Sequence, residues 1–142
     1  MIPLPAPKPE ILARRAEIVA ALQALVHGDG VIAEGIRLKP YETDGLSAYR
    51  QMPLAVVLPS STEQVAAVLR YCHEQGIRVV PRGAGTSLSG GALPLADAVV
   101  VGLMRLNAIH EINYADRYAV VGAGVTNIGI TKAVEGEGFF YA

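Results

Sequence analysis

The sequence predicts an α+β chain: a small parallel βαβ subdomain with flanking helices, followed by the start of an antiparallel α+β subdomain. Three short segments, 55–58, 77–80 and 98–101, are mainly apolar, with Arg78 as the one charged residue among them, and 98–101 is apolar throughout, which is typical of a strand buried on both faces of a parallel sheet. Two later strand candidates, 109–113 and 118–121, mix apolar and polar residues around a short turn and indicate an antiparallel hairpin. This change of pattern marks the boundary between the two subdomains.

The first part of the chain is expected to form an arm, a helix and a linker. Alternating prolines over residues 1–8 favour an extended, partly disordered arm. Between Pro9 and Gly28 apolar residues recur at helical spacing, and these two residues suit the first position and the end of a helix. From 29 to 52 the pattern breaks up into loop, in which Asp44 is expected to cap a turn.

A second helix is predicted between the first two apolar strands. Ser61 and Gln64 form a capping box at its start, and Gly76 ends it. Because a helix connects segments 55–58 and 77–80, we expect these strands to form a parallel pair with a right-handed crossover. The expected apolar face of this helix is Val65, Val68, Leu69 and Cys72.

A last helix is predicted after the hairpin. Thr126 or Asn127 supplies its N-cap, and the helical pattern continues to about Glu135. The chain then closes on aromatic residues rather than on a polar tail, so we expect it to be the N-terminal part of a longer protein.

The strongest functional signal is the glycine-rich stretch 79–91, VVPRGAGTSLSGG. Glycines allow main-chain N–H groups to approach phosphate oxygens, and the three hydroxyl residues add neutral donors. The stretch leaves the carboxyl end of an apolar strand, where ligands bind in parallel sheets. We therefore expect a diphosphate-bearing cofactor held mainly by main-chain amides, with a flexible loop without a ligand as the open alternative. Arg82, its only charge, either neutralises a phosphate or braces the loop through carbonyls.

Two better-known phosphate motifs are excluded. A nucleoside-triphosphate loop needs Lys and then Ser or Thr after its last glycine, whereas Gly91 and Ala92 follow Gly90. The dinucleotide fingerprint needs a third glycine three residues after the second, and Leu88 stands at that spacing.

The glycine stretch, with its neighbours, resembles the pyrophosphate loop of the vanillyl-alcohol-oxidase-type (PCMH-type) FAD-binding domain, closest to the glycolate oxidase and D-lactate dehydrogenase branch. Segments 43–61, 104–107 and 121–125 extend the match, which covers roughly residues 40–142. The resemblance implies an incomplete PCMH-type FAD-binding domain over 46–142, behind an arm, helix and linker over 1–45. Its first subdomain is 46–106, and the start of its second is 107–142. It assigns FAD contacts to Pro81, Arg82, Gly83, Ala84, Gly85, Thr86, Ser87, Gly90, Gly91, Gly122 and Val125.

The resemblance also implies a function. Some members carry histidine at the position of Thr86 and attach the flavin covalently; threonine cannot, so FAD is expected to bind non-covalently. The chain would be the N-terminal part of the FAD-binding subunit of a flavin-dependent 2-hydroxy-acid dehydrogenase, which moves a hydride from the substrate Cα to flavin N5. Its partners would be other redox subunits, a second FAD-binding subunit and an iron–sulfur subunit. The acid–base residues of such enzymes lie in a later domain, so no catalytic residue is named.

Alternatives stay open at this point. Another oxidase or dehydrogenase of the same superfamily, acting on D-lactate, an alcohol or a sugar, fits the same residues. A non-catalytic binding or assembly module is the second alternative. Residues 1–142 alone are expected to bind FAD weakly or not at all, to be inactive, and to self-associate through an unfinished second subdomain.

Composition excludes several other classes. A net charge of −1 without basic blocks argues against nucleic-acid binding. The single cysteine, Cys72, excludes a disulfide framework, and the three histidines show no metal-ligand spacing, so no metal site is expected. No apolar run is long enough to span a bilayer, and the first residues lack the apolar region of a signal peptide. A cytoplasmic location is the expectation, with peripheral membrane association through partner subunits as an alternative.

Overall fold

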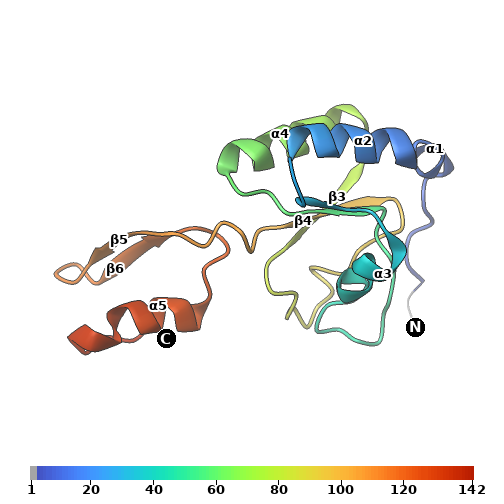
Figure 1. Cartoon of the computed structure of the whole chain (residues 1–142). Helices are drawn as coiled ribbons and strands as arrows, with labels where there is room; N and C mark the ends of the chain where they lie inside the picture. The colour runs from blue at the N-terminus through green and yellow to red at the C-terminus, as the bar shows by residue number, and fades with distance from the viewer. Residues whose placement is uncertain (1–2) are drawn as a thin grey trace.

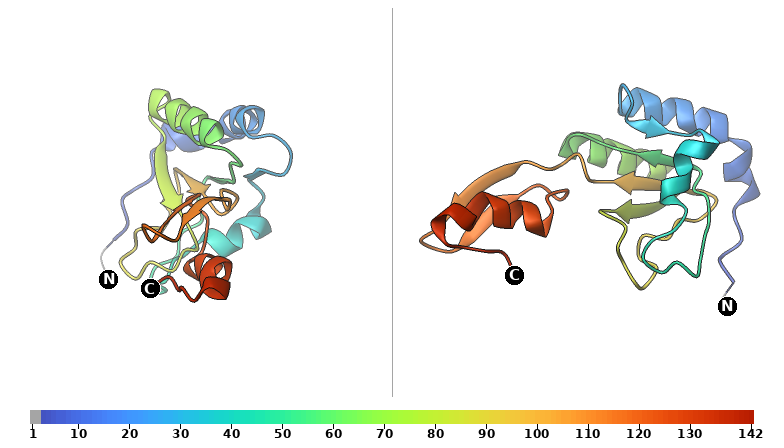
Figure 2. Two further views of the ribbon diagram at one scale, coloured as in Figure 1. Left: turned by 90° about the vertical axis from the view of Figure 1, so that its left-hand side faces the viewer. Right: turned by 60° about the horizontal axis from the view of Figure 1, so that its bottom comes forward.

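The chain folds into two lobes joined by the extended segment 103–108 (Figure 1). The computed structural model describes residues 3–142, so the start of the predicted arm, residues 1–2, lies outside it. The N-terminal lobe contains a four-stranded sheet with helices on both faces, and the C-terminal lobe contains a two-stranded hairpin and one helix (Figure 2). The α+β class predicted from the sequence, with parallel strands followed by an antiparallel hairpin, is confirmed.

The helices of the N-terminal lobe are α1 (Pro9–Ala13), α2 (Arg15–Leu25), α3 (Gly35–Leu38), the 3-10 turn η1 (Lys39–Tyr41) and α4 (Thr62–Glu74). Its strands are β1 (Val31–Ile32), β2 (Ala55–Val57), β3 (Arg78–Arg82) and β4 (Ala98–Gly102). The C-terminal lobe consists of β5 (Ile109–Asn113), β6 (Tyr118–Val121), α5 (Asn127–Val134) and the 3-10 turn η2 (Glu135–Glu137). No helix of the described residues is both long and apolar enough to cross a bilayer.

The strand order of the larger sheet is β1-β2-β4-β3. The predicted pairing of the first two apolar strands is therefore wrong: β2 and β3 each pair in parallel with β4, which lies between them. Every residue of β4 is buried, and its uninterrupted small and branched side chains suit the central position. Consequently β3 is an edge strand, and the glycine-rich stretch begins at the edge of the sheet.

Both faces of the sheet are covered by apolar side chains. Above it, α2 and α4 pack against alternate residues of the strands, including Val57, Val99 and Val101. Below it, Val56, Val100 and residues of the α3 segment form a second, smaller cluster. Because the N-terminal helices supply Ile18 and Leu22 to the first cluster, residues before 45 belong to the same core as β2 and β4.

Three local predictions need correction. The predicted first helix is interrupted at Arg14, whose φ of −94° and ψ of 11° separate α1 from α2. The segment 29–52, predicted as loop, contains β1, which pairs antiparallel with β2, and the short helix α3. Leu69, predicted on the buried face of α4, is 44% exposed, whereas Val68 and Cys72 on that face are fully buried.

Several helix ends were predicted correctly from local sequence signals. Ser61 caps α4 by accepting a hydrogen bond from the amide of Gln64, and Gly76 follows the helix with a φ of +65°. The second bond of the predicted capping box also forms, but the Gln64 side-chain oxygen accepts from the amide and hydroxyl of Ser60 rather than from the amide of Ser61. Thr126 caps α5 by accepting from Gly129, as predicted.

The antiparallel hairpin and the last helix of the C-terminal lobe are confirmed, and α5 runs alongside the hairpin (Figure 1). A bulge between Ile109 and Glu111 shifts the register near the base of the hairpin. Phe139 packs on Tyr114 with ring centroids 5.5 Å apart, whereas Phe140 is 77% exposed.

The Tyr71 hydroxyl on α4 is buried without a hydrogen-bond partner among the described residues. Burial also raises the pKa of this phenol. We expect Tyr71→Phe to raise the free energy of unfolding by about 1 kcal/mol, because it removes an unsatisfied polar atom and keeps the ring. Urea unfolding measures this. The control is Tyr118→Phe, which loses a bond to Glu111 on an exposed surface and should be neutral or slightly destabilising; equal effects would contradict the expectation.

Burial raises the pKa of the Cys72 thiol to about 11. The pKa of the thiol in the unfolded chain has its ordinary value of 9.0, so the folded-state contribution of Cys72 is complete below that pH and is lost as pH rises towards 11. We expect the free energy of unfolding of the wild type to fall relative to that of Cys72→Ala over this range, measured by urea unfolding at pH 7.5, 9 and 10.5. A constant difference between the two proteins would refute this assignment.

Candidate functional site

The glycine-rich stretch forms an open loop at the carboxyl end of β3, below the sheet (Figure 1). The strand continues two residues beyond the predicted bend at Val80, through Pro81 and Arg82. Proline is tolerated there because β3 is an edge strand and pairs only with β4. The loop therefore begins at Gly83, and the Arg82 carbonyl just before it accepts a hydrogen bond of 2.9 Å from the amide of Leu103, where β4 leaves for the second lobe.

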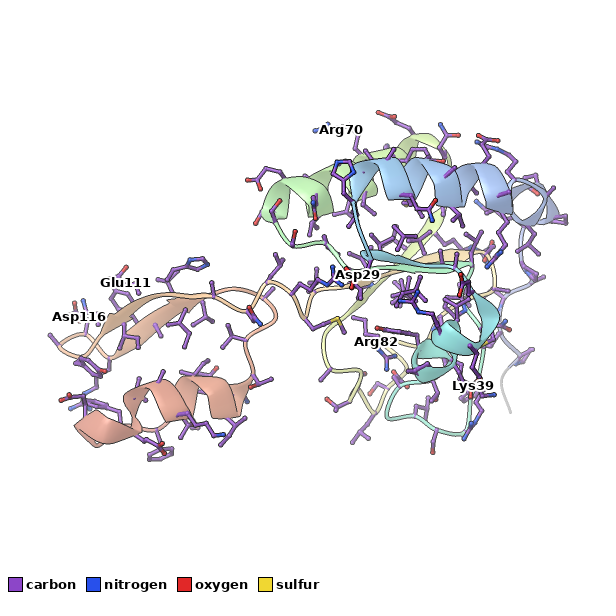
Figure 3. All side chains as sticks on the ribbon, in the orientation of Figure 1. Asp29, Lys39, Arg70, Arg82, Glu111 and Asp116 are labelled. Carbon is purple, nitrogen blue, oxygen red and sulfur yellow. The ribbon has the colours of Figure 1, made fainter. Side chains whose placement is uncertain are left out.

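Arg82 points inward, below the sheet and beside α3 (Figure 3). Its guanidinium donates to the main-chain carbonyls of Thr43 at 2.7 Å and, more weakly, of Pro40 at 3.4 Å and Ala92 at 3.5 Å. The ring of Tyr41 lies 5.5 Å from the charge. Of the two roles that the sequence left open for this side chain, the structure shows the second: it braces the loop through carbonyls.

The amides of residues 83–88 face no acceptor. Among the described residues, none of these six consecutive N–H groups donates a main-chain or side-chain hydrogen bond, and the segment is exposed or half-buried. At Gly83 an added Cβ would meet no atom within 4 Å, so the space beside the chain is open. Unpaired amides along such a turn suit the oxygens of a diphosphate, so the residues present fit that group.

The far side of the loop is held by its own residues. The Ser87 hydroxyl accepts hydrogen bonds from the amides of Ser89 and Gly91, at 3.4 and 3.3 Å, and keeps its own proton free to donate. Gly90 has a φ of +77°, a conformation that glycine adopts without strain. Gly90 therefore supplies the turn at the end of the loop, and the Gly91 amide links that turn to Ser87.

Gly122 and Val125, the other two predicted contact residues, lie at the base of the C-terminal lobe. Their amides donate within the protein, to Ala108 at 2.8 Å and to Gly122 at 3.1 Å. A Cβ at Gly122 would lie 2.2 Å from the Leu106 carbonyl oxygen, so this glycine permits two main-chain segments to cross. Contact of these two residues with a ligand remains a prediction.

A cavity of about 510 Å³ lies beside this crossing. It is lined by the start of α4, the linker and the Gly122 turn, residues 60–63, 105–108, 110 and 121–123. Arg105 at its edge pairs with Asp29 at 2.8 Å, and this hydrogen bond lowers the pKa of the Asp29 carboxyl. Arg105 and His110, which line this cavity, were not predicted as site residues. Their position depends on the path of the segment between the two lobes, and no local sequence pattern predicts that path.

Titratable groups near the glycine loop do not form a catalytic cluster. Glu42 is buried, and hydrogen bonds from Lys39 and Arg50 lower its pKa. Within residues 3–142, no three His, Cys, Asp or Glu side chains are grouped so that they could hold a metal ion. The site therefore offers hydrogen-bond donors for an anion rather than ligands for a cation.

A run of unpaired amides at the carboxyl end of a strand is typical of the diphosphate-binding loops of nucleotide-binding proteins. The model of the FAD-binding domain family matches residues 53–142, and the chain belongs to that family. FAD is thus the cofactor for which this domain is built, and the PCMH-type fold implied by the resemblance is confirmed.

Relatives with curated names are similar over most of the chain. Glycolate oxidase subunit GlcD of Escherichia coli K12 is 46% identical over 90% of this chain and 26% of its own length. D-2-hydroxyglutarate dehydrogenase of Xanthomonas citri is 35% identical over 87% of this chain and 26% of its own length. The chain thus spans about a quarter of the length of these curated relatives.

Solved structures share the fold. The crystal structure of p-cresol methylhydroxylase with substrate bound has a TM-score of 0.78 and 26% identity, over 89% of this chain and 25% of that chain. The 4-ethylphenol oxidase from Gulosibacter chungangensis in complex with isoeugenol has a TM-score of 0.78 and 27% identity, over 94% of this chain and 26% of that chain.

Proposed function

We propose that this chain is the cofactor-binding N-terminal part of an FAD-dependent dehydrogenase acting on a 2-hydroxy acid, with glycolate as the first substrate to test. The observation that carries the proposal is the run of unpaired amides at 83–88, in a chain 46% identical to a glycolate oxidase subunit. Because a D-2-hydroxyglutarate dehydrogenase is also similar to this chain, D-2-hydroxyglutarate is the second candidate substrate.

In this proposal the glycine loop binds the diphosphate of FAD, and Gly122 and Val125 contact the adenosine half. When bound, FAD accepts the hydride from the substrate. The loop amides bind and orient the diphosphate, and the Ser87 hydroxyl donates to one of its oxygens. The exposed Thr86 has no nucleophile of the kind that forms flavin links in histidine-bearing relatives, so attachment is non-covalent. Acid–base groups come from the rest of the protein.

The name of the relative as a subunit supports a second proposal, that the complete protein works with redox partner subunits. Electrons from the reduced cofactor would then pass to another FAD-binding subunit and to an iron–sulfur subunit. Co-purification of the tagged full-length protein, followed by iron and flavin analysis, tests this assembly.

The function is tested on the full-length protein. We expect a yellow preparation whose flavin is released into solution by acid precipitation, and dye reduction with glycolate, D-lactate or D-2-hydroxyglutarate. A protein that stays colourless with added FAD would refute the enzyme hypothesis and favour a binding or assembly module. Bound flavin with oxidation of alcohols or sugars alone would assign another branch of the superfamily.

Gly83→Ala tests the site separately from the fold. An added Cβ meets no protein atom within 4 Å, so stability without cofactor should be unchanged, while the methyl group narrows the space for a diphosphate. We expect the dissociation constant of FAD to rise about tenfold or more, a difference of ~1.4 kcal/mol. The matched control is Gly35→Ala, which also meets no atom within 4 Å but is the first residue of α3 and not part of the loop.

A further inference from the structure

Segment 40–46, which follows α3, contacts the glycine loop at its beginning, middle and end. At the beginning, the Arg82 guanidinium donates to the carbonyls of Thr43 and Pro40. At the end, the amide of Ala92 donates to Asp44 Oδ2 at 3.2 Å, across 48 residues of sequence. Asp44 is buried, and its other oxygen, Oδ1, accepts from the amide of Leu46 at 2.9 Å, which is the turn cap predicted from the sequence. One carboxylate therefore closes its own turn and holds the loop.

In the middle, Gly45 lies against the loop's main chain. A Cβ at this position would come within 2.7 Å of the Ser87 carbonyl oxygen and 2.8 Å of the Thr86 carbonyl oxygen. In a trans peptide the carbonyl and the N–H of one unit point in opposite directions. With these two carbonyls facing Gly45, the amides of Ser87 and Leu88 point away from the segment, into the open side of the loop.

The loop also fits closely around Arg82. Gly85 has a φ of +75°, and an added Cβ would overlap the guanidinium, so the loop chain packs directly on the charged group. The orientation of the unpaired amides is thus set by protein contacts at both ends and in the middle.

We propose that segment 40–46 is a brace that aims the amides of the glycine loop at the diphosphate of FAD, with Asp44 and Gly45 as positioning residues. This inference rests on the proposed function and adds to it two residues that do not themselves touch the cofactor. A hydrogen-bond donor set aimed in advance binds an anion without the cost of ordering the loop.

Asp44→Asn separates the two roles of the carboxylate. The amide oxygen of asparagine still accepts from Leu46, while its NH₂ group cannot accept from Ala92, so the turn survives and the link to the loop is lost. Gly45→Ala keeps both hydrogen bonds and displaces the Thr86 and Ser87 carbonyls instead. The two variants perturb one brace by independent means, so one of them serves if the other does not fold.

The measurement is made on full-length protein stripped of flavin, at a temperature where every variant is folded. FAD is titrated by its fluorescence change, and ADP, which carries the same diphosphate, is titrated by displacement of FAD. We expect both dissociation constants to rise about tenfold in Asp44→Asn, the scale of one net hydrogen bond, and more in Gly45→Ala. A parallel loss for FAD and ADP identifies the diphosphate as the affected part.

Glu42→Gln is the matched control for a merely structural role. Glu42 lies in the same segment and is equally buried, but its carboxylate pairs with Lys39 and Arg50 and not with the loop. Its thermal stability should fall while its affinity for FAD and ADP stays within twofold of wild type. Equal affinity losses in all three variants, or wild-type affinity in Asp44→Asn and Gly45→Ala, would overturn the brace. A wild type that binds neither FAD nor ADP would overturn the proposed function, and the brace with it.

Discussion

Gly122→Ala is expected to destabilise the protein by about 3 kcal/mol or more, even without any cofactor. The added Cβ would lie 2.2 Å from the Leu106 carbonyl oxygen, a main-chain atom that cannot rotate away as a flexible side chain would. The same crossing is bridged by the bond from the Gly122 amide to Ala108, so relief of the clash also breaks a hydrogen bond. Urea unfolding followed by circular dichroism measures the loss.

Gly136→Ala is the control for this prediction. It lies in η2, and an added Cβ meets no atom within 4 Å, so stability should be unchanged or slightly raised. If Gly122→Ala instead leaves stability at the wild-type value and weakens only FAD binding, the glycine serves the ligand and not the crossing of the chain.

Asp97→Ala should cost about 3 kcal/mol of stability. The Asp97 side chain is fully buried and accepts from the Lys8 amide at 3.0 Å and from Arg78 at 3.1 Å. Removing Asp97 leaves the Arg78 charge without its partner, which costs about 3–5 kcal/mol for a buried pair. Because the Arg78 side chain is partly exposed to solvent, we expect a loss at the lower end of this range. The N-terminal arm should also loosen, because the bond from its Lys8 amide is lost and Arg78, which donates to the Ala6 carbonyl, loses its carboxylate partner; limited proteolysis at residues 3–8 reports this directly.

Asp29→Ala supplies the contrast. Asp29 pairs with Arg105 at a similar distance, 2.8 Å, but its side chain is 77% exposed. Exposed pairs contribute less than about 1 kcal/mol, so this variant should stay close to wild type. Equal losses in the two variants would show that burial does not decide the strength of these pairs.

Elements with local signals could be predicted from the sequence. The cap at Ser61, the end at Gly76, the hairpin and the cap at Thr126 each depend on residues within a few positions of one another. The two-residue strand β1 gave no such signal, because it is too short for an alternating pattern and exists only by pairing with β2. The strand order could not be predicted either. The apolar residues of β4 indicate that it is buried, but they do not indicate which strands pair with it on either side.

The same distinction between local signals and long-range contacts holds for the candidate site. The glycine stretch, and FAD as the cofactor of the domain, could be predicted because the motif is continuous. The role of the Arg82 side chain could not be decided, since its carbonyl partners at Thr43 and Pro40 come from 39 and 42 residues earlier. Asp44 was correctly expected to cap a turn, but its bond to Ala92 follows only from the packing of two distant loops.

The bond from the Leu103 amide to the Arg82 carbonyl has a mechanical consequence. It fastens Arg82, the last strand residue before the glycine loop, to the first residue of the segment that runs to the C-terminal lobe. A displacement of that lobe is therefore transmitted to the root of the loop through this bond as well as to β4 through the chain itself.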